Sequence, residues 1–427
     1  MRARDILTAA VVLVAGGSGC DWRDFDSLRS ATPVLAIEAP SEYPAGNDFA
    51  QLLVATPPPS DGSAAARFLT SALLQTAVSY VTVSPGGSAS AHLVTSPTLD
   101  DLAGQPVTAM AAIPGTDQAL LAGGGAVMTL DLAASPPTVV AFPGITLGVA
   151  AEPYLGIGLA AGALTGGPTP DKVVASATGL HVYADGGATE LAATTSAACP
   201  IALASSVVAS DRIQRAVLIA PLTGGGAVIA IGTPGVGGPG NVSFFAADKA
   251  AATLSCLFSI TAPGGEPEFG RSLAVGRFQA TGLNLVVGAP PQHAYIYQAP
   301  LAAGATPKTT LTGDTATGEF GAAVASLAEV GQPLDTVFVG DPAATTNGQE
   351  GAGEVIEFGG VQVGPARAAT LADRSAGAND AYGASVAALP FCATPKCATP
   401  TLLPLVGAAN KAFVYFALFS GDDPRAK

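Results

Sequence analysis

Three segments of the C-terminal half share one pattern and decide the fold: FGRSLAVGRF (269–278), FGAAVASLAE (320–329) and YGASVAALPF (382–391). Each is followed by an apolar run that contains glycine at or near its end: NLVVGAP (284–290), DTVFVGD (335–341) or LLPLVGA (402–408). A run with aromatic residues comes next: AYIYQ (294–298), EVIEF (354–358) or AFVYF (412–416). A threonine-rich run, KTTLTG (308–313), follows the first copy. Short apolar runs bounded by Gly and Pro predict strands, so the pattern predicts a repeated unit of four strands.

Weaker copies of this pattern occur upstream and begin at PVLAIEA (33–39), PVTAMAAI (106–113), LGIGLAAG (155–162) and PIALASSV (200–207). In the first copy, the second and third strands are expected at QLLVATP (51–57) and VSYVTV (78–83). In the fourth copy, they are expected at AVLIAP (216–221) and GGAVIAIG (225–232). The count is therefore seven. Repeats that cannot bury their faces alone must stack on one another.

The strands expected here are apolar throughout instead of alternating, which is typical of sheets covered on both faces. Residues 33–427 therefore predict an all-β fold, a seven-bladed β-propeller of four-stranded antiparallel blades. An open β-solenoid and two smaller propellers are the alternatives. The last copy has no clear fourth strand after AFVYF. We expect the N-terminal segment 21–32, which contains DFDSLRS (24–30), to supply that strand and close the ring.

The chain resembles the FG-GAP repeat of integrin α-subunit propellers and related bacterial proteins. The residues that carry the resemblance are Phe269, Gly270, Gly288, Ala289, Pro290, Phe320, Gly321, Tyr382 and Gly383. The resemblance implies a propeller and, in many members, calcium in an Asp-rich loop before the second strand. Here those loops keep only one or two acidic groups, such as Asp117, Asp171 and Asp335. A site for calcium needs six to eight oxygen atoms, whereas a lone carboxylate caps a turn, so we expect no metal and no cofactor.

Residues 1–20, MRARDILTAAVVLVAGGSGC, have the layout of a secretory signal peptide. A basic start precedes an apolar segment that is too short to span a bilayer. Cys20 follows small residues and resembles the lipobox cysteine of bacterial lipoproteins, which implies that it becomes an acylated N-terminus. We therefore expect a lipid-anchored protein of the cell envelope that faces the periplasm or the cell surface. The alternative is secretion with cleavage nearby and an unmodified Cys20.

The chain has five cysteines, an odd number for an exported protein. If Cys20 is acylated, the other four form two couples. Cys392 and Cys397 lie either side of a turn, whereas Cys199 and Cys256 open and close the fourth repeat. No histidine lies beside either couple, so we expect structural disulfides, Cys392–Cys397 and Cys199–Cys256, and no metal site.

The composition excludes several classes of protein. With 49% hydrophobic residues, the chain has enough apolar surface to fold, which excludes a disordered protein. Beyond the N-terminus no apolar run is long enough to span a membrane, so the only expected membrane contact is the lipid anchor. The net charge of −14 argues against nucleic acid as a partner.

Acidic residues precede each of the three clear Phe-Gly or Tyr-Gly pairs and are expected to form a rim on one face: Glu266, Glu268, Asp314, Glu319, Asp373 and Asp380. They form either a solvated rim or a site for a cation or a basic ligand. The chain has three histidines, His92, His181 and His293, and no nucleophile elbow, zinc-protease motif or P-loop. We therefore expect a non-catalytic protein.

The function predicted from these observations is a binding platform for a protein or glycan partner. Its specificity would come from loops near 56–76, 233–241 and 341–353, because loops on a rigid scaffold commonly carry function. The alternatives are an envelope-assembly or structural scaffold, and a hydrolase or lyase that uses the mouth of the propeller.

Overall fold

The computed structural model describes residues 34–416 except 42, 44–48, 60, 73–76, 95–105, 135–136, 141, 143–154, 186–188, 195, 204–214, 236–237, 280–281, 316–317, 329–331, 360–365, 374, 395–396 and 398. By its contacts the chain divides into two units, 1–34 with 415–427, and Leu35–Val414. The second unit contains the fold described below. No helix occurs in the described part of the chain, so none there could cross a membrane.

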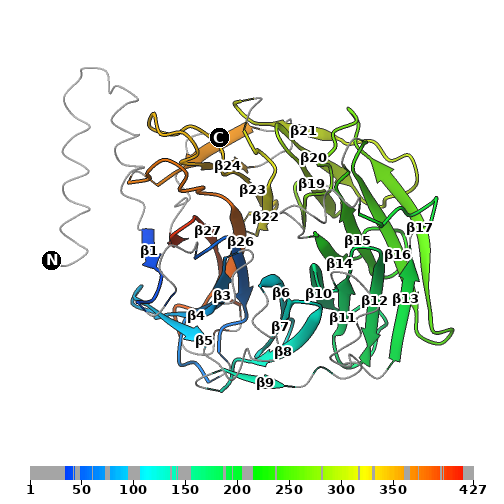
Figure 1. Cartoon of the computed structure of the whole chain (residues 1–427), viewed down its shortest axis with the longest axis horizontal. Helices are drawn as coiled ribbons and strands as arrows, with labels where there is room; N and C mark the ends of the chain where they lie inside the picture. Colours follow the sequence, from blue (N-terminus) through cyan, green and yellow to red (C-terminus); the bar gives the residue numbers. More distant parts are fainter. Residues whose placement is uncertain are drawn as a thin grey trace. The chain divides into compact units, whose positions relative to one another are not determined.

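The unit is a ring of seven four-stranded sheets, or blades (Figure 1). Blade 1 consists of β2 (Leu52–Thr56), β3 (Ala66–Ser71), β4 (Val78–Val83) and β5 (Ala89–Val94). Blade 2 consists of β6 (Val107–Ile113), β7 (Gln118–Gly123), β8 (Ala126–Asp131) and β9 (Thr138–Val140). Blade 3 consists of β10 (Gly158–Gly162), β11 (Asp171–Ala175), β12 (Gly179–Ala184) and β13 (Thr189–Thr194). Blades 4 and 5 consist of β14 (Val217–Ala220), β15 (Val228–Thr233), β16 (Asn241–Asp248) and β17 (Thr253–Thr261); and β18 (Ser272–Gly276), β19 (Asn284–Ala289), β20 (His293–Gln298) and β21 (Thr309–Thr312).

Blade 6 consists of β22 (Ala323–Leu327), β23 (Thr336–Asp341), β24 (Glu354–Gly359) and β25 (Ala366–Leu371). Blade 7 consists of β26 (Ser385–Phe391), β27 (Thr401–Gly407), β28 (Lys411–Tyr415) and β1 (Val34–Glu38). The first strands of successive blades, β2, β6, β10, β14, β18, β22 and β26, lie against one another, and β26 lies against β2. The predicted seven-bladed propeller of antiparallel blades is therefore confirmed.

The strand that completes the last blade is β1, which pairs with β28. The N-terminal segment 21–32, expected to take this place, lies outside the described residues. The prediction that Val34–Glu38 opens the first blade is wrong, because these residues form the outer strand of blade 7 and blade 1 begins at Leu52. In blade 4 both expected strands are displaced by one, because β14 and β15 are the first and second strands and not the second and third. In blade 1, β2 is the first strand and not the second, whereas VSYVTV forms the third strand, β4, as predicted; the second strand, β3, was not predicted. Strands buried on both faces look alike in sequence, so the hydrophobic pattern does not number them.

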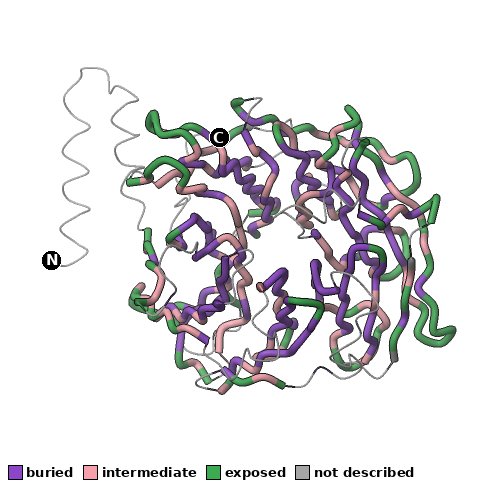
Figure 2. The backbone as a smooth tube through the Cα atoms, viewed as in Figure 1, coloured by how far each residue is buried: buried purple, intermediate pink, exposed green. Residues whose placement is uncertain are grey.

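The apolar strands pack blade against blade, and most of the tube in the interior of the ring is buried (Figure 2). One such interface joins blades 4 and 5, where Phe244, Phe269 and Tyr297 belong to the same apolar cluster. Such layers bury both faces of a blade, which explains why the strands are apolar throughout.

The two ends of the ring differ in the connections that they carry. Because each blade is an antiparallel meander, the connection between its second and third strands lies at the same end as the connection to the next blade. We call this end the linker face and the other end the opposite face. Lys411 at the start of β28 pairs with Glu38 at the end of β1 (3.3 Å), so β1 runs antiparallel to β28 and the chain enters it at the opposite face.

Candidate functional site

The residues that carry the FG-GAP resemblance lie at the boundaries between blades. Phe269, Phe320 and Tyr382 are fully buried three residues before the first strands of blades 5, 6 and 7. The glycines that follow them, Gly270, Gly321 and Gly383, have φ of +92°, +97° and +91°. Only glycine adopts this backbone without strain.

Each of these glycines also contacts the preceding blade. A Cβ on Gly288 of β19 would lie 2.0 Å from the carbonyl oxygen of Gly321, at the start of the next blade. A Cβ on Gly340 would meet Gly383 in the same way, at 2.1 Å. Ala289, next to Gly288, is fully buried, and Pro290 follows it in the turn to β20. The motif residues therefore pack blade on blade.

The equivalent pair of the first blade is Phe49-Ala50, which the sequence analysis missed. Phe49 is fully buried three residues before β2, and a Cβ on Gly407 of blade 7 would lie 1.9 Å from the carbonyl oxygen of Ala50. The same contact therefore joins the last blade to the first. The signal in the sequence was a phenylalanine three residues before an apolar run, hidden because alanine replaces glycine.

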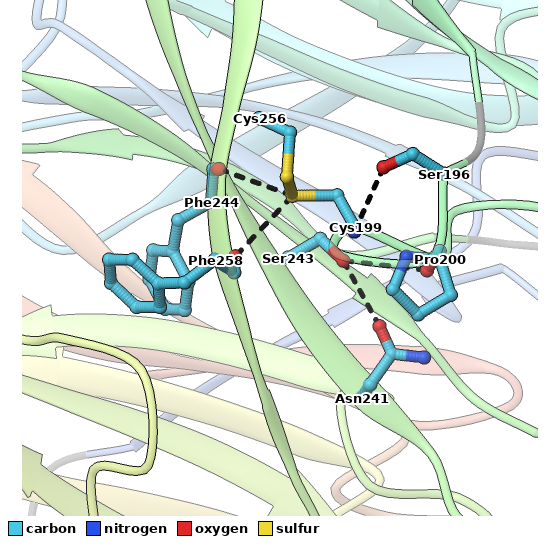
Figure 3. The surroundings of a disulfide bond; sticks show 8 residues. All are labelled: Ser196, Cys199, Pro200, Asn241, Ser243, Phe244, Cys256 and Phe258. Atoms are coloured by element: carbon cyan, nitrogen blue, oxygen red, sulfur yellow. Dashed lines mark hydrogen bonds between the residues drawn. A yellow bond between two sulfur atoms is a disulfide. The ribbon is translucent and has the colours of Figure 1, made fainter.

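Both predicted disulfides are formed. Cys199 precedes blade 4 and bonds to Cys256 in β17, with Cα atoms 5.9 Å apart (Figure 3). The sulfur of Cys199 lies 3.7 Å and 3.5 Å from the carbonyl oxygens of Phe244 and Phe258. These are packing contacts, because a disulfide sulfur has no hydrogen to donate. Cys392 and Cys397 bond across the β26–β27 connection (Cα atoms 5.6 Å apart). Cys20 lies outside the described residues.

The carboxylates expected before the second strands make structural hydrogen bonds. Asp171 accepts the backbone N–H groups of Leu164 (2.9 Å) and Thr165 (2.6 Å), which confirms that it caps the β10–β11 turn. Asp335 accepts the backbone N–H of Arg277 from blade 5 (2.8 Å). Among the described residues, no group of three or more His, Cys, Asp or Glu could hold a metal ion.

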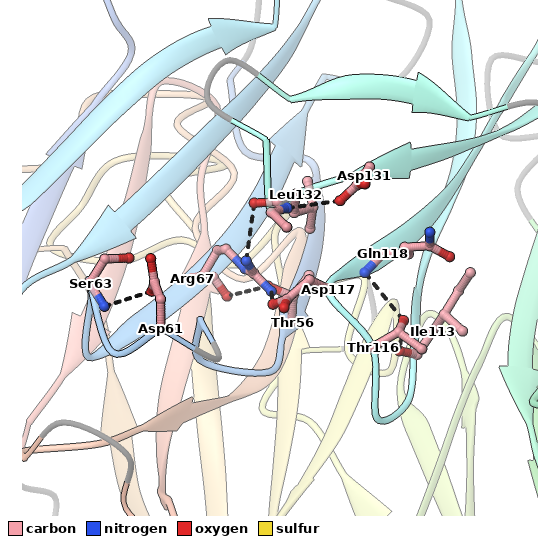
Figure 4. Close-up of polar contacts among 11 residues, drawn as sticks. Thr56, Asp61, Ser63, Arg67, Ile113, Thr116, Asp117, Gln118, Asp131 and Leu132 are labelled. Carbon is pink, nitrogen blue, oxygen red and sulfur yellow. Dashed lines mark hydrogen bonds and ion pairs between the residues drawn. The ribbon is translucent and has the colours of Figure 1, made fainter.

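Asp117 binds the buried guanidinium of Arg67 (2.6 Å), which is 1% exposed (Figure 4). Arg67 also donates to Thr56 Oγ1 (3.0 Å) and to the carbonyl oxygen of Leu132 (3.3 Å). Arg67 lies on β3 of blade 1, whereas Asp117 directly precedes β7 and Leu132 directly follows β8, both of blade 2. This ion pair therefore connects blades 1 and 2.

A second buried cation, Arg215, precedes blade 4. It donates to neutral oxygens: the carbonyls of Ser176 (2.8 Å) and Gly232 (3.3 Å) and the hydroxyl of Thr233 (2.6 Å). Burial lowers the pKa of Arg215 to about 9. Ser176 follows the second strand of blade 3, so Arg215 joins blades 3 and 4. The sequence analysis missed both arginines, because an isolated Arg carries no signal of burial.

The predicted acidic rim lies on the linker face, because its members fall in the connections between blades 4 and 5, 5 and 6, and 6 and 7: Glu266, Glu268, Asp314, Glu319, Asp373 and Asp380. Asp314 forms an ion pair with Arg367 of β25 (2.5 Å). Asp373 and Asp380 accept backbone N–H groups of their own turns, from Ser375 (2.8 Å) and Gly377 (2.6 Å).

Glu266, another member of this set, has a side chain that is 16% exposed. It accepts the hydroxyl of Tyr295 (2.5 Å) and lies 3.3 Å from Nδ1 of His293. Burial opposes ionisation, but the hydrogen bonds from Tyr295 and the backbone outweigh it and lower the pKa of Glu266. Burial and the neighbouring Glu266 raise the pKa of Tyr295.

Two further carboxylates lie at the linker end of blade 6. Burial raises the pKa of Asp341 and of Glu354 above their ordinary values. Asp341 is 1% exposed and accepts the backbone N–H of Glu319 (2.6 Å). Asp341 therefore packs between blade 6 and the preceding linker, whereas Glu354 faces Arg367 of its own blade (3.9 Å).

The histidines are separated. His92, His181 and His293 lie on β5, β12 and β20, in three different blades. His181 contacts Glu190 of the adjacent strand (2.9 Å). The fold therefore does not bring the three histidines together into one site.

The loops expected to carry specificity fall on different ends. The loops 233–241 and 341–353 connect second to third strands and lie on the linker face. The range 56–76 is divided, because it contains the β2–β3 connection of the opposite face, the strand β3 and part of the β3–β4 connection.

Two segments of the linker face are hydrogen-bonded to each other, and together we call them the ridge: the β23–β24 connection, 342–353, and the linker from blade 6 to blade 7, 372–384, of which residue 374 is not described. Thr346 and Gln349 exchange backbone hydrogen bonds (3.1 and 3.0 Å). Asn379 and Ala381 donate their backbone N–H groups to Glu350 (3.0 Å) and Gly351 (2.9 Å). The two segments are therefore fastened together backbone to backbone.

The ridge also holds strained backbone and exposed polar groups. Asn347, Asn379 and Ala381 have φ of 53°, 65° and 50°. Asparagine adopts such angles more readily than other residues that have a side chain, so the strain falls mainly on Ala381. The exposed residues of the ridge are Thr345, Asn347, Gly348, Gln349, Glu350, Ser375, Gly377, Ala378 and Asn379.

In comparisons with known proteins, no family model matches the chain and no curated protein is significantly similar to it.

Proposed function

We propose that the protein is an exported, lipid-anchored component of the bacterial cell envelope, whose propeller binds a protein or glycan partner through its linker face. The observation that carries the proposal is the ridge. Its hydrogen-bonded backbone fixes the two segments that carry the amide, hydroxyl and carboxylate groups, and a preorganised backbone loses little entropy when it binds.

The chemistry of the ridge suits a polar ligand. Asn347, Gln349 and Asn379 each offer both a donor and an acceptor, and Glu350 adds an acceptor. The large hydrophobic residues that are exposed in the described part of the chain are Val34, Val140 and Leu257, none of them in the ridge. We therefore expect recognition by hydrogen bonds and not by an apolar patch.

Two disulfides suit an oxidising compartment outside the cytoplasm.

The anchor is tested by replacing Cys20 with Ser in the full chain and fractionating cells. We expect the variant to leave the membrane fraction, because the acyl chains are its only expected attachment. An unchanged distribution between membrane and soluble fractions would contradict lipidation.

The binding function is tested with a ridge variant, Gln349→Ala/Glu350→Ala, and a control, Thr306→Ala/Lys308→Ala. All four residues are exposed, but the control pair lies in the β20–β21 connection on the opposite face. The full-length proteins, immobilised in detergent, are exposed to envelope proteins and to a panel of bacterial surface polysaccharides. We expect the wild type and the control to retain a ligand, and the ridge variant to retain it at least about tenfold more weakly, as the loss of two hydrogen bonds implies.

Two results would contradict the proposal. The first is that the wild type retains no ligand from either panel. The second is that the ridge variant retains as much ligand as the control variant.

A further inference from the structure

The outer strand of blade 4, β17, differs from the other outer strands in length. It has nine residues, whereas β1, β5, β9, β13, β21 and β25 have three to six. It is the last strand of its sheet and runs along the outside of the ring (Figure 1). The outer edge of such a strand presents backbone N–H and C=O groups that can pair with another strand.

The composition of β17 gives that edge no protection. Its sequence, TLSCLFSIT, contains no charged residue, no proline and no glycine. Proteins normally protect sheet edges with charges, prolines or very short strands. The other outer strands of five or more residues each contain an ionisable residue: Glu38, His92, Glu190 or Arg367. The remaining two, β9 and β21, have three and four residues.

The middle residue of β17 is an exposed leucine. Phe244 and Phe245 of β16 pair with Phe258 and Cys256, so Leu257 has no residue opposite and forms a bulge. Leu257 is 43% exposed, whereas Leu254 and Ile260, on either side of the bulge, are buried in two different clusters. A large apolar side chain therefore stands at the centre of an uncharged edge.

These features fit a second copy of the same strand. In antiparallel pairing around a twofold axis at Leu257, Thr253 faces Thr261 of the second copy and no like charges meet within the strand. The two bulges then coincide on the axis, and the regular halves of the strands pair with each other. The Cys199–Cys256 disulfide already fixes the strand in place, which lowers the entropy lost on pairing.

We propose that two copies of the protein associate edge to edge through β17, with the twofold axis at Leu257. The pairing joins two four-stranded blades into one eight-stranded sheet. It uses the periphery of the ring and leaves the ridge of each copy on the linker face.

Cysteine cross-linking of the full chain in its membrane tests this pairing. Thr253→Cys and Thr261→Cys, both at exposed positions, are produced separately and together in the same cells. Opposite residues in an antiparallel pair lie about 4.5–5.5 Å apart, within the range of a disulfide. We expect a cross-linked dimer when the two variants are present together, and none from either variant alone, because each cysteine then lies several residues from its counterpart.

A second change tests the apolar contact. Leu257→Lys, added to the cysteine pair, is expected to lower the yield of cross-linked dimer at least about tenfold, because two like charges would meet on the axis. Val140→Lys is the matched control, since Val140 is 40% exposed on another outer strand, and should leave the yield unchanged.

The proposal is overturned if the two variants together give no dimer, if either alone gives as much, or if the cross-linked band contains a different protein. Equal yields with Leu257→Lys and Val140→Lys would also overturn it. The ridge variant described above should still dimerise, so failure of the binding function leaves this result unaffected.

Discussion

Individual residues at the blade boundaries set how closely the blades approach. A Cβ on Gly288 would lie 2.0 Å from a carbonyl oxygen of the next blade, and a Cβ on Gly340 would lie 2.1 Å from one. The atoms in the way belong to the backbone, which cannot rotate aside as a side chain can. The glycines of the motif are therefore required by packing, independently of any ligand.

Gly288→Ala should lower the free energy of unfolding by about 3 kcal/mol, the upper range for overpacking a core. Gly225→Ala is the control, because its Cβ would meet nothing within 4 Å, and should change stability by no more than about 0.5 kcal/mol. Urea unfolding followed by circular dichroism measures both. Equal midpoints would show that the blades separate easily enough to admit a methyl group.

The buried ion pair makes a second prediction at this scale. Asp117→Ala leaves the guanidinium of Arg67, 1% exposed, without this carboxylate, and should cost about 3 kcal/mol or more. Asp61→Ala removes an exposed carboxylate that accepts the backbone N–H of Ser63 (2.8 Å), and should leave the urea midpoint unchanged. If the two variants have the same urea midpoint, burial of the Arg67 guanidinium does not require the carboxylate of Asp117.

At the scale of strands and blades, the sequence predicts seven blades of four strands, but it does not reliably predict which position in its blade each apolar run takes. Blades 5 to 7 were identified because Phe269, Phe320 and Tyr382 mark their first strands. In blade 4 the predicted strands are displaced by one, and in blade 1 the first strand is mistaken for the second. In blade 1 the mark is Phe49 followed by alanine, and in blade 4 Arg215 occupies the position that glycine takes in blade 5, two residues before the first strand.

The candidate site was predicted only in part. The acidic residues of the linkers fall on one face as expected, because their place depends on strand order alone. The ridge could not be predicted, since it depends on backbone hydrogen bonds between Glu350 or Gly351 and a linker about thirty residues further along the chain. The partners of Asp117 and Asp335 come from neighbouring blades, which no local pattern reveals.

The two disulfides should differ in their contribution to stability. Cys199 and Cys256 are 57 residues apart, and Cys392 and Cys397 are five apart. From the entropy of loop closure, removing the first should cost about 4 kcal/mol and removing the second about 2 kcal/mol. Urea unfolding of Cys199→Ala/Cys256→Ala and Cys392→Ala/Cys397→Ala measures the two costs. A larger loss in the second variant would mean that the short disulfide holds the loop against blade 1, where the backbone N–H of Cys392 donates to the carbonyl oxygen of Ala65 (2.7 Å), and that this outweighs loop entropy.

At the scale of the whole molecule, the central claim is that a strand from the start of the ring completes its last blade. β1 pairs with β28, which lies more than 370 residues further along the chain, so every blade has four strands only when the two ends of the unit meet. A ring closed in this way should unfold as one cooperative unit, since loss of β1 exposes an edge of blade 7 and frees both ends.

The most direct test is the unfolding of two variants of the same strand. Ile37 is 5% exposed and Val34 is 42% exposed. If β1 closes the ring, Ile37→Ala should lower the free energy of unfolding by about 3 kcal/mol in a single urea transition, as for a buried side chain truncated to alanine. Val34→Ala should change it by no more than about 0.5 kcal/mol. Equal midpoints for Ile37→Ala, Val34→Ala and the wild type would contradict closure by Val34–Glu38.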